Sequence, residues 1–294
     1  MTSPYPHITQ ALAVAVAGDT VLVGPGRYAE ELRTVRPGRP GAPIRIVGRP
    51  GTHLVGPRGR GRGRLIQVLH DHVTLQSLEL SDANILVWVE GAKGVRLLRS
   101  RLHDAGGECM RLKGVATANE VAGNVIARCG RVRFNLARGS KNGEAIYIGT
   151  APEQSGGRPD RSDGNRVHHN RIAATAECVD VKEAALRNLV ERNRCSGSDD
   201  PDGGRALLAG RPHHLPVEHF HPARRRRHPP RSVRPDPGGA QQRGRQHPHR
   251  QRGLRSQGAA APPGPDRGQH LRPQPSRAHE PEAVATRAGR PLRS

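Results

Sequence analysis

Short stretches of alternating apolar and polar residues recur along the first two hundred positions of the chain. Four segments align with one another, namely GVRLLRSRL (94–102), NEVAGNVIA (119–127), NRVHHNRIA (165–173) and NLVERNRCS (188–196). The seventh residue of the first segment, Ser100, and the sixth residues of the other three, Asn124, Asn170 and Asn193, follow one another at spacings of 24, 46 and 23. Because 46 is two periods of 23, the pattern indicates a structural repeat of about 23 residues.

A second series of apolar alternations runs in parallel with the first. Its members are VWVEGA (87–92), MRLKGV (110–115), IYIGTA (146–151) and VDVKEA (179–184), at spacings of 23, 36 and 33. The alternation has period 2, which favours strands over helices. The two longer spacings predict insertions, which we place at GSKNG (139–143) and at the polar segment PEQSGGRPDRSDG (152–164).

These repeats predict an all-β fold, a parallel β-solenoid of about 23 residues per coil. Inward aliphatic side chains would stack from coil to coil, and the recurring asparagines would bond along the stack at the turns. We expect roughly seven coils over residues 1–204, beginning with strands in 20–28 and 43–48. The amphipathic stretch ITQALAVAVA (8–17) is the expected N-terminal capping helix, because a solenoid must shield its open end.

Composition separates a second region, residues 205–294. The whole chain carries a formal net charge of +22, but 205–294 holds 19 Arg, no Lys and 5 acidic residues, whereas 1–204 has a net charge of only +8. The same region holds 15 of the 26 prolines and 9 of the 16 histidines. Such a segment cannot bury a core, so we expect it to be disordered.

Three explanations of residues 205–294 are open: ordinary disorder, a basic polyanion-binding arm, and a β-helix read out of frame. A shift by one base makes Arg245-Gln246-His247 and Gly268-Gln269-His270 both compatible with Gly-Asn-Thr. The two asparagine positions would be 23 residues apart, as in the repeats. We therefore favour a frameshift near Gly204, and we expect no nucleic-acid partner.

Other functional classes find little support in the sequence. No apolar run is long enough to span a membrane, and no signal peptide is visible at the N-terminus. Four cysteines, Cys109, Cys129, Cys178 and Cys195, leave a disulfide possible without showing which residues pair. We expect Cys109 and Cys178 to point outward. A zinc site at His168 and His169 is disfavoured, because adjacent strand residues point in opposite directions.

Two outward columns are expected on the strands of the second series. One holds Trp88, Arg111, Tyr147 and Asp180, and the next holds Glu90, Lys113, Gly149 and Lys182. Stacked coils place neighbours in a column about 4.8 Å apart. Aromatic, cationic and acidic side chains would then share one surface, as in a groove for an anionic sugar polymer. Ordinary surface charges on exposed strands are the alternative.

The chain resembles a known group of folds in its first part. The stretch I-x-Q-A-L with AVAGDTVLVGPGRY, then PIRIVG and the N-x-V-x-x-N repeats, looks like the right-handed parallel β-helix proteins of the pectate-lyase-like superfamily over residues 4–204. GEAIYIG (143–149) and AECVDVKEA (176–184) are most similar to the alginate lyase and chondroitinase B type of polysaccharide lyase. The opening motif points to the fold and not to a reaction.

The resemblance implies a calcium site and a lysine base. By position, Glu177 would be a calcium ligand and Lys182 the general base that removes the C5 proton of a uronate, with Asn142 as a weaker candidate ligand. A second glutamate expected at 175 is Thr175 here, so Asp180 or Glu144 would substitute. The arginine of the family pattern cannot be assigned. Without a metal, Lys182 beside Asp180 and Glu183 would stay protonated.

Three hypotheses follow. The first is a secreted, monomeric lyase that cleaves an acidic polysaccharide by calcium-assisted β-elimination, with Lys182 catalytic, Trp88, Arg111 and Tyr147 binding substrate, and Glu177, Asp180, Glu144 and Asn142 holding the metal. The second is a non-catalytic carbohydrate-binding or surface β-helix protein. The third is an inactive truncated product. Secretion follows from the resemblance only, and no membrane attachment is expected.

Overall fold

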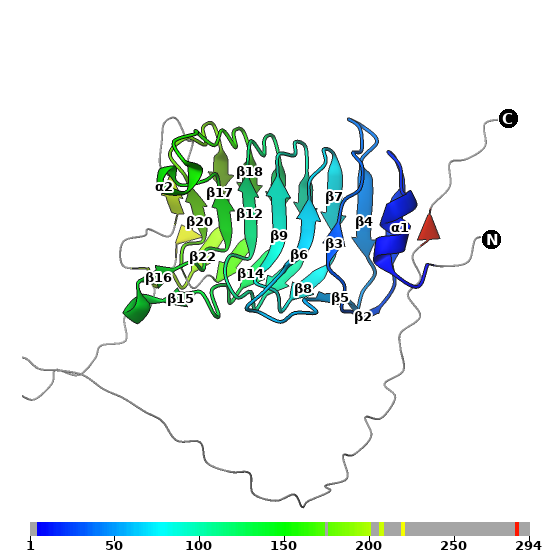
Figure 1. Cartoon of the computed structure of the whole chain (residues 1–294), viewed down its shortest axis with the longest axis horizontal. Helices are drawn as coiled ribbons and strands as arrows, with labels where there is room; N and C mark the ends of the chain where they lie inside the picture. The colour runs from blue at the N-terminus through cyan, green and yellow to red at the C-terminus, as the bar shows by residue number, and fades with distance from the viewer. Residues whose placement is uncertain (1–4, 174–175, 201–205, 209–218, 221–285, 288–294) are drawn as a thin grey trace, which may run out of the picture. The chain divides into compact units, whose positions relative to one another are not determined.

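The chain forms a parallel β-helix in which successive coils lie side by side (Figure 1). The computed structural model describes residues 5–173, 176–200, 206–208, 219–220 and 286–287. About seven coils of about 25 residues each are present, so the predicted architecture is confirmed, with a slightly longer mean repeat than the expected 23. Each coil contributes one strand to each of three sheets.

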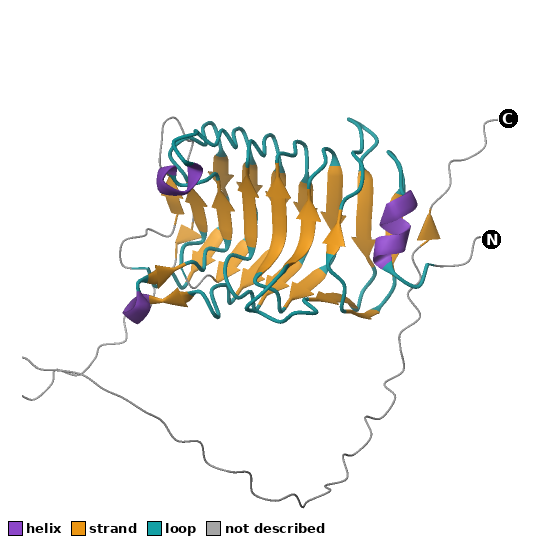
Figure 2. Cartoon of the chain, viewed as in Figure 1, coloured by secondary structure: helices purple, strands orange, loops and turns teal. Residues whose placement is uncertain are grey.

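The three sheets are continuous along the stack (Figure 2). The first consists of β1 (Thr20–Val23), β4 (Ile44–Gly48), β7 (Val73–Gln76), β10 (Arg96–Leu98), β13 (Glu120–Ala122), β18 (Arg166–His168) and β21 (Leu189–Glu191), with β25 (Thr286–Arg287) antiparallel to β1. The second consists of β2 (Gly26–Tyr28), β5 (Thr52–Val55), β8 (Glu79–Ser81), β11 (Arg101–His103), β14 (Val125–Ala127), β19 (Arg171–Ala173), β22 (Arg194–Ser196) and β24 (His219–Phe220). The third consists of β3 (Leu32–Arg33), β6 (Arg64–Val68), β9 (Ile85–Glu90), β12 (Met110–Lys113), β17 (Ile146–Ile148), β20 (Val179–Val181) and β23 (Ala206–Leu208).

The core is a stack of aliphatic side chains inside the coils. In the first sheet, Leu75, Leu97, Val121, Val167 and Val190 pair in register from coil to coil and are fully buried. At the N-terminal end, helix α1 (Ile8–Val14) buries its apolar side against this core, as the capping function requires. The hydrophobic alternation therefore fixes both the strand register and the cap.

The recurring asparagines form a hydrogen-bonded ladder at the turn between the first and second sheets. The backbone N–H of Ser100 donates to Oδ1 of Asn124 (2.8 Å), that of Asn124 to Oδ1 of Asn170 (2.9 Å), and that of Asn170 to Oδ1 of Asn193 (3.0 Å). Each of these asparagines is buried. The prediction that asparagine side chains bond along the stack is confirmed.

A second asparagine ladder runs beside the first, and we did not predict it. Asn119, Asn165 and Asn188 are the first residues of the aligned segments, and the backbone N–H of Val95, Asn119 and Asn165 donates to the Oδ1 of the next rung at 2.7, 3.0 and 2.8 Å. The motif N-x-V-x-x-N contains both ladders. The sequence signal was therefore available in the first asparagine of each repeat.

The two predicted insertions are present and carry short elements of their own. The first holds a hairpin of β15 (Phe134–Asn135) and β16 (Ser140–Lys141), linked by the 3₁₀ turn η1 (Leu136–Arg138). The second holds the one-turn helix α2 (Pro152–Ser155). The insertions follow β14 and β17, two strands of the same coil. Both project from the stack, and the strands on either side keep their register.

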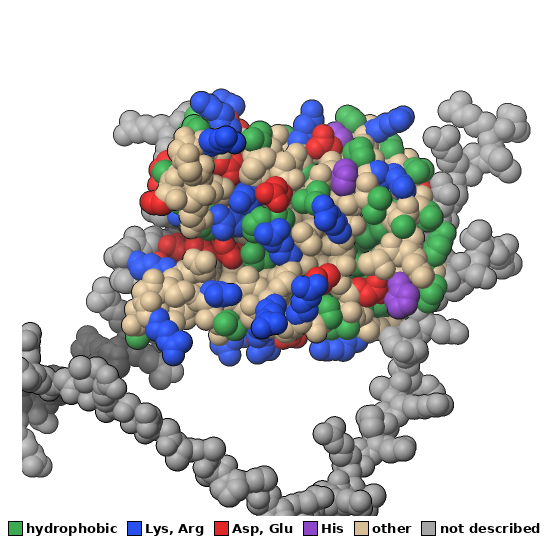
Figure 3. Space-filling model, in the orientation of Figure 1, with side chains coloured by type: hydrophobic (Ala, Val, Ile, Leu, Met, Phe, Trp, Pro, Cys, Tyr) green, Lys and Arg blue, Asp and Glu red, His purple; other side chains and the backbone are tan. Residues whose placement is uncertain are grey.

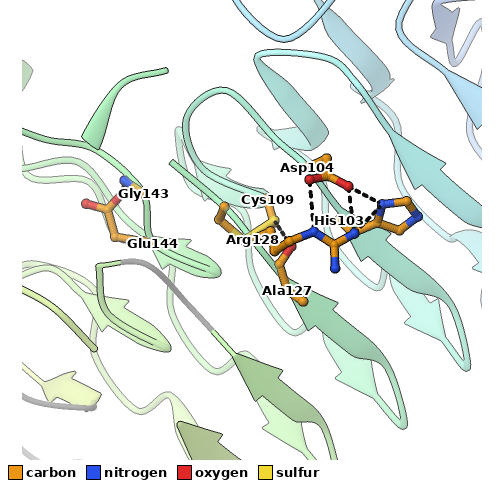
Figure 4. The surroundings of a disulfide bond; sticks show 8 residues. His103, Asp104, Cys109, Ala127, Arg128, Gly143 and Glu144 are labelled. Atoms are coloured by element: carbon orange, nitrogen blue, oxygen red, sulfur yellow. Dashed lines mark hydrogen bonds and ion pairs between the residues drawn. A yellow bond between two sulfur atoms is a disulfide. The ribbon is translucent and has the colours of Figure 1, made fainter. Parts of the chain in front are cut away.

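Two disulfides join neighbouring parts of the stack. Cys109 pairs with Cys129, and Cys178 pairs with Cys195; Figure 4 shows the first of them. The expectation that Cys109 and Cys178 point outward is wrong, because both are buried in the core. Each lies just before its strand, where the chain turns a corner, so strand alternation does not predict its direction.

Removing the first disulfide is expected to destabilise the fold. The bond closes a loop with a sequence separation of 20 residues, and loops of that size restrict the unfolded chain by about 3 kcal/mol. We expect the double variant Cys109→Ala/Cys129→Ala to lose about 2–4 kcal/mol of unfolding free energy, as measured by urea titration. An unchanged midpoint and slope would contradict a stabilising role for this bond.

Two short strands of the C-terminal region belong to the β-helix. Strands β23 and β24 continue the third and second sheets past residue 204, where we expected the domain to end. The rest of 205–294 lies outside the described residues, and its predicted disorder and frameshift stay predictions. None of the helices in the described ranges is long and apolar enough to cross a lipid bilayer.

Candidate functional site

An acidic column runs along the edge of the third sheet at which its strands begin. Glu108, Glu144 and Glu177 precede β12, β17 and β20 in three successive coils, and all three are buried. Backbone bonds fix their register: the N–H of Cys109 donates to the carbonyl of Glu144 (3.0 Å), and the N–H of Ala145 donates to that of Glu177 (2.9 Å). Three carboxyl groups are therefore stacked at one corner of the β-helix.

The sequence contains a signal for this column that we missed. GECMRLKG (107–114), GEAIYIGT (143–150) and AECVDVKE (176–183) align residue by residue. Glu108 therefore corresponds to Glu177, and Lys113 to Lys182. Sequence reasoning singled out Glu144 and Glu177 but not Glu108, because the repeat was searched for apolar alternation and not for the acid before each strand.

The three glutamates have different partners. Oε1 of Glu108 accepts a hydrogen bond from Arg111 Nη1 (2.9 Å) in a buried ion pair. Oε2 of Glu144 accepts from the backbone N–H of Gly143 (2.9 Å). Oε2 of Glu177 and Oδ1 of the nearby Asp180 are buried and accept no hydrogen bond from any described residue. Buried carboxylate oxygens without a donor are costly, and they indicate a place for a cation or a proton.

Burial and the charges of neighbouring acids raise the pKa of Glu144, Glu177 and Asp180. Desolvation, together with the charge of Glu108, raises the pKa of Glu144 to about 8. Desolvation and the charges of Asp180 and Asp200 raise the pKa of Glu177 to about 7. The pKa of Asp180 is also raised, chiefly by desolvation. Glu144 and Glu177 are therefore partly protonated at neutral pH unless a cation neutralises them.

Lys182 lies beside these buried acidic side chains. Its Nζ is 2.8 Å from Oδ2 of Asp180, and its side chain is 18% exposed. Desolvation lowers the pKa of Lys182, but the hydrogen bond and charge of Asp180 outweigh it and hold the pKa well above its usual range. In this arrangement Asp180 holds the lysine as an ammonium ion.

The column of Trp88, Arg111, Tyr147 and Asp180 is confirmed in register. Cations alternate with aromatic rings along it: the guanidinium carbon of Arg64 lies 3.5 Å from the Trp88 ring centroid, and that of Arg111 lies 4.2 Å from the Tyr147 centroid. Lys182 Nζ lies 4.9 Å from the same Tyr147 centroid. We call this set, Arg64, Trp88, Arg111, Tyr147 and Lys182, the cation–aromatic column.

The expectation of an open aromatic platform needs correction. Trp88 and Tyr147 point outward from the coils but are only 6% and 4% exposed. The cations beside their rings cover them, and Arg111 also donates from Nη2 to Oε1 of Gln154 in helix α2 (3.2 Å). In the space-filling view, acidic side chains gather between the places that α2 and β16 occupy in Figure 1, with Lys and Arg around them (Figure 3).

The predicted metal ligands are only partly brought together. Glu177 and Asp180 present buried oxygens without a donor, and Glu144 lies one coil away. Asn142 is exposed on the loop before β17. Among the described residues, Glu144, Glu177 and Asp180 do not form a group whose ligand oxygens all lie within 4.8 Å of one another. The donor set is all oxygen, which suits a hard cation such as calcium, but its members stand apart.

We expect stability to fall as the pH rises from about 5 to 8. Glutamates in the unfolded chain ionise near their ordinary pKa of 4.5, whereas Glu177 and Glu144 hold their protons in the folded chain until about pH 7 and 8. The folded state therefore binds more protons in this window, and its free energy of unfolding decreases with pH, on the order of 2–4 kcal/mol. Urea unfolding at pH 5, 6.5 and 8 measures it.

Glu144→Gln should flatten this pH dependence, because an amide has no proton to lose. The exposed Glu153, in helix α2, provides the control Glu153→Gln, which should keep the wild-type slope. Acids whose pKa is lowered, such as Asp160, change protonation below pH 5. They do not affect the slope of stability between pH 5 and 8. A flat wild-type profile between pH 5 and 8 would show that the acidic column is already neutralised.

Comparison with solved structures finds the same parallel β-helix fold in two proteins. The chain superimposes on the crystal structure of alginate lyase from Paenibacillus sp. str. FPU-7 with a TM-score of 0.60 and 22% identity, covering 65% of this chain and 64% of that one. It superimposes on pectate lyase Pel9A with a TM-score of 0.50 and 14% identity, covering 69% of this chain and 52% of that one.

These likenesses show the parallel β-helix fold, and the chain spans less than two thirds of the length of either lyase. No protein-family model matches the sequence, and no curated protein sequence matches it significantly.

Proposed function

We propose that this β-helix is a polysaccharide lyase that acts on an acidic, uronate-containing polymer. The observation that carries the proposal is the pair of buried carboxylate oxygens, on Glu177 and Asp180, that lack a donor beside Lys182. A cation site next to a lysine on one β-helix face is the arrangement that proton abstraction beside a carboxylate needs. The likeness to an alginate and a pectate lyase supports the same class of substrate.

The cation–aromatic column would bind the polymer. Arg111 supplies positive charge for uronate carboxylates, and the rings of Trp88 and Tyr147 keep its guanidinium in place. Desolvation raises the pKa of Tyr147 to about 12, so its hydroxyl keeps a proton at neutral pH. Because the rings are covered, substrate must move Arg64 or helix α2 aside before it stacks on them.

Calcium fits the acidic group by donor chemistry, and Glu177 and Asp180, with Glu144, would hold it. When bound, a calcium ion neutralises the substrate carboxylate and stabilises the negative charge that develops beside it. A readout besides activity is available, because calcium should remove the loss of stability expected at pH 8 and have little effect at pH 5. The exposed Asn142 would join only if its loop moved inward.

Lys182 would act as the base after its ammonium group has lost a proton to solvent, which requires that the charge of Asp180 be neutralised. The amine takes the proton from C5 of the uronate, the electron pair forms the C4–C5 double bond, and the bond from C4 to the glycosidic oxygen breaks. The leaving oxygen takes up a proton, for which the Tyr147 hydroxyl is an available donor. The products are a new reducing end and an unsaturated uronate.

A second candidate function is a non-catalytic carbohydrate-binding or surface β-helix. The ion pair of Lys182 with Asp180 favours it, because a lysine held as an ammonium binds anions but removes no proton. Under this alternative the cation–aromatic column is a binding surface only. An inactive truncated product is the third hypothesis.

Two disulfides among the described residues support a location outside the reducing cytosol. We therefore propose that the protein acts outside the cell, and we keep the monomer as a prediction. An acidic polymer as the partner agrees with the cations of the column.

The test is incubation with alginate, pectate, and chondroitin or dermatan sulfate, with and without calcium, followed by the absorbance of unsaturated uronates. Calcium-dependent absorbance with one polymer supports the lyase, and EDTA should abolish it. Retention of a polymer in affinity electrophoresis without new absorbance supports the binding module. Neither signal with any of these polymers would reject both functions.

A further inference from the structure

A second group of chemically active side chains lies on the outer face of the second sheet, away from the acidic column. His53 on β5, Glu79 on β8 and His103 on β11 come from three consecutive coils. His53 pairs directly with Glu79 across the strands, and His103 pairs with Ser81, two residues after Glu79. The strand register therefore brings two imidazoles and one carboxylate together.

These three side chains converge. Nε2 of His103 lies 2.9 Å from Oε1 of Glu79, and the two imidazole ring centroids lie 5.9 Å apart. One ligand atom from each residue lies within 4.8 Å of the other two, and no other group of three acidic, histidine or cysteine side chains in the described ranges meets that criterion. His103 is 12% and Glu79 38% exposed, so the group is open to solvent on one side.

We propose that His53, Glu79 and His103 form a binding site for a divalent transition-metal ion of the zinc type. Two imidazole nitrogens and one carboxylate oxygen are the donor set that zinc accepts, with water completing a tetrahedral shell on the open side. Nitrogen donors favour such ions over calcium, which takes oxygen ligands. The site is therefore chemically distinct from the all-oxygen acidic column.

The surroundings orient the ligands as a metal site requires. Nδ1 of His103 lies 2.9 Å from Oδ2 of Asp104, and Arg128 donates to both oxygens of that carboxylate (Figure 4). A carboxylate on the second ring nitrogen of a ligating histidine is the usual second contact in metal sites. On the other side, Nε2 of His53 lies 2.9 Å from Oγ of Ser81. Both rings are thus fixed by neighbours from their own or the next coil.

Both ring nitrogens of His103 face carboxylates, Asp104 at Nδ1 and Glu79 at Nε2. Arg128 and Arg101 lie beside the same two carboxylates. A metal ion between His103 and Glu79 would have His53 within reach as its third protein ligand.

The same chain contains another pair of histidines beside a glutamate, formed by His168, His169 and Glu120. Nε2 of His168 lies 3.0 Å from Oε1 of Glu120, and its Nδ1 lies 2.8 Å from Nδ1 of His169. Our expectation that the two histidines point apart is wrong, because His169 has a positive φ of 56° that turns its ring back. Glu120 and His169 nevertheless contact opposite nitrogens of the His168 ring. The three residues therefore cannot share one ion.

The test counts bound zinc in the full chain. Because the chain has 16 histidines, the measured quantity is a difference: equilibrium dialysis at buffered free Zn²⁺ should give one equivalent fewer for His53→Gln/His103→Gln than for wild type. His168→Gln/His169→Gln is the matched control and should bind as wild type does. Excess Ca²⁺ should not compete.

Further variants keep the test decisive if the double variant folds poorly, which circular dichroism would show. Glu79→Gln replaces a partly exposed ligand without changing its size and should also lose the equivalent. Asp104→Asn should weaken zinc binding about 10–100-fold through His103. Equal zinc content in wild type, the double variant and Glu79→Gln would overturn the proposal, whatever the lyase assays show.

Discussion

Replacing Lys182 by alanine should slow the formation of unsaturated uronates by about 10²–10⁴-fold, the range that a positioned general base contributes. Under the proposed function, Lys182 is the group that takes the C5 proton, and its side chain lies against Tyr147 and Asp180. The loss should fall on kcat, because the polymer still meets Arg111 and the other cations. The initial rate of absorbance increase with saturating polymer measures it.

The controls for this variant separate chemistry from charge and from folding. Lys93 is an exposed lysine in the loop between β9 and β10, outside the site, so Lys93→Ala should keep the wild-type rate. Lys182→Arg keeps the positive charge but is a much weaker base, so it should bind polymer and remain slow. If Lys182→Ala retains most of the rate while its unfolding midpoint is normal, Lys182 is not the base.

Replacing Asn170 by alanine should cost about 3 kcal/mol or more of unfolding free energy. Its Oδ1 accepts from the backbone N–H and from Nδ2 of Asn124 (2.9 Å each), and its own Nδ2 donates to Val121 O and to Oδ1 of Asn193 (2.9 Å each). Alanine leaves several buried polar groups unsatisfied at once, each at about 1–3 kcal/mol. Urea unfolding followed by circular dichroism measures the loss.

Asn135 provides the matched control for the ladder, because it is an exposed asparagine in the inserted hairpin. Asn135→Ala should change the unfolding free energy by no more than about 0.5 kcal/mol. Asn170→Asp should cost at least as much as Asn170→Ala, since a buried carboxylate would set an oxygen against Val121 O and Asn193 Oδ1, which both need a donor. Similar small losses for Asn170→Ala and Asn135→Ala would show that the ladder adds little to stability.

Most of the fold could be predicted because a solenoid repeats one physical solution. The Val-x-Val alternation fixes which side chains face the core, and the asparagine spacing fixes how coils stack. Pairs such as Arg111 with Tyr147 follow from these two constraints alone. Both insertions also follow, since any residues beyond one period must leave the stack.

The site was harder to predict, for reasons that are local. The direction of Cys109 and Cys178 is set at corners, where strand alternation no longer applies. The burial of Trp88 depends on Arg64, a residue of an earlier coil whose side chain reaches across the stack. The group of His53, Glu79 and His103 can be found only when the register of three coils is known, because its members are about 25 residues apart in the sequence.

The two disulfides also change the chain's connectivity. The Cys109–Cys129 and Cys178–Cys195 bonds bridge 20 and 17 residues, most of one circuit of about 25 residues. Each therefore turns part of the backbone into a closed hoop around the core. A protease that cuts once inside a hoop leaves both fragments covalently tied and still stacked, so the protein survives nicks there that would sever an open coil. Resistance to digestion is thus built into the coils that carry Glu108 and Glu177.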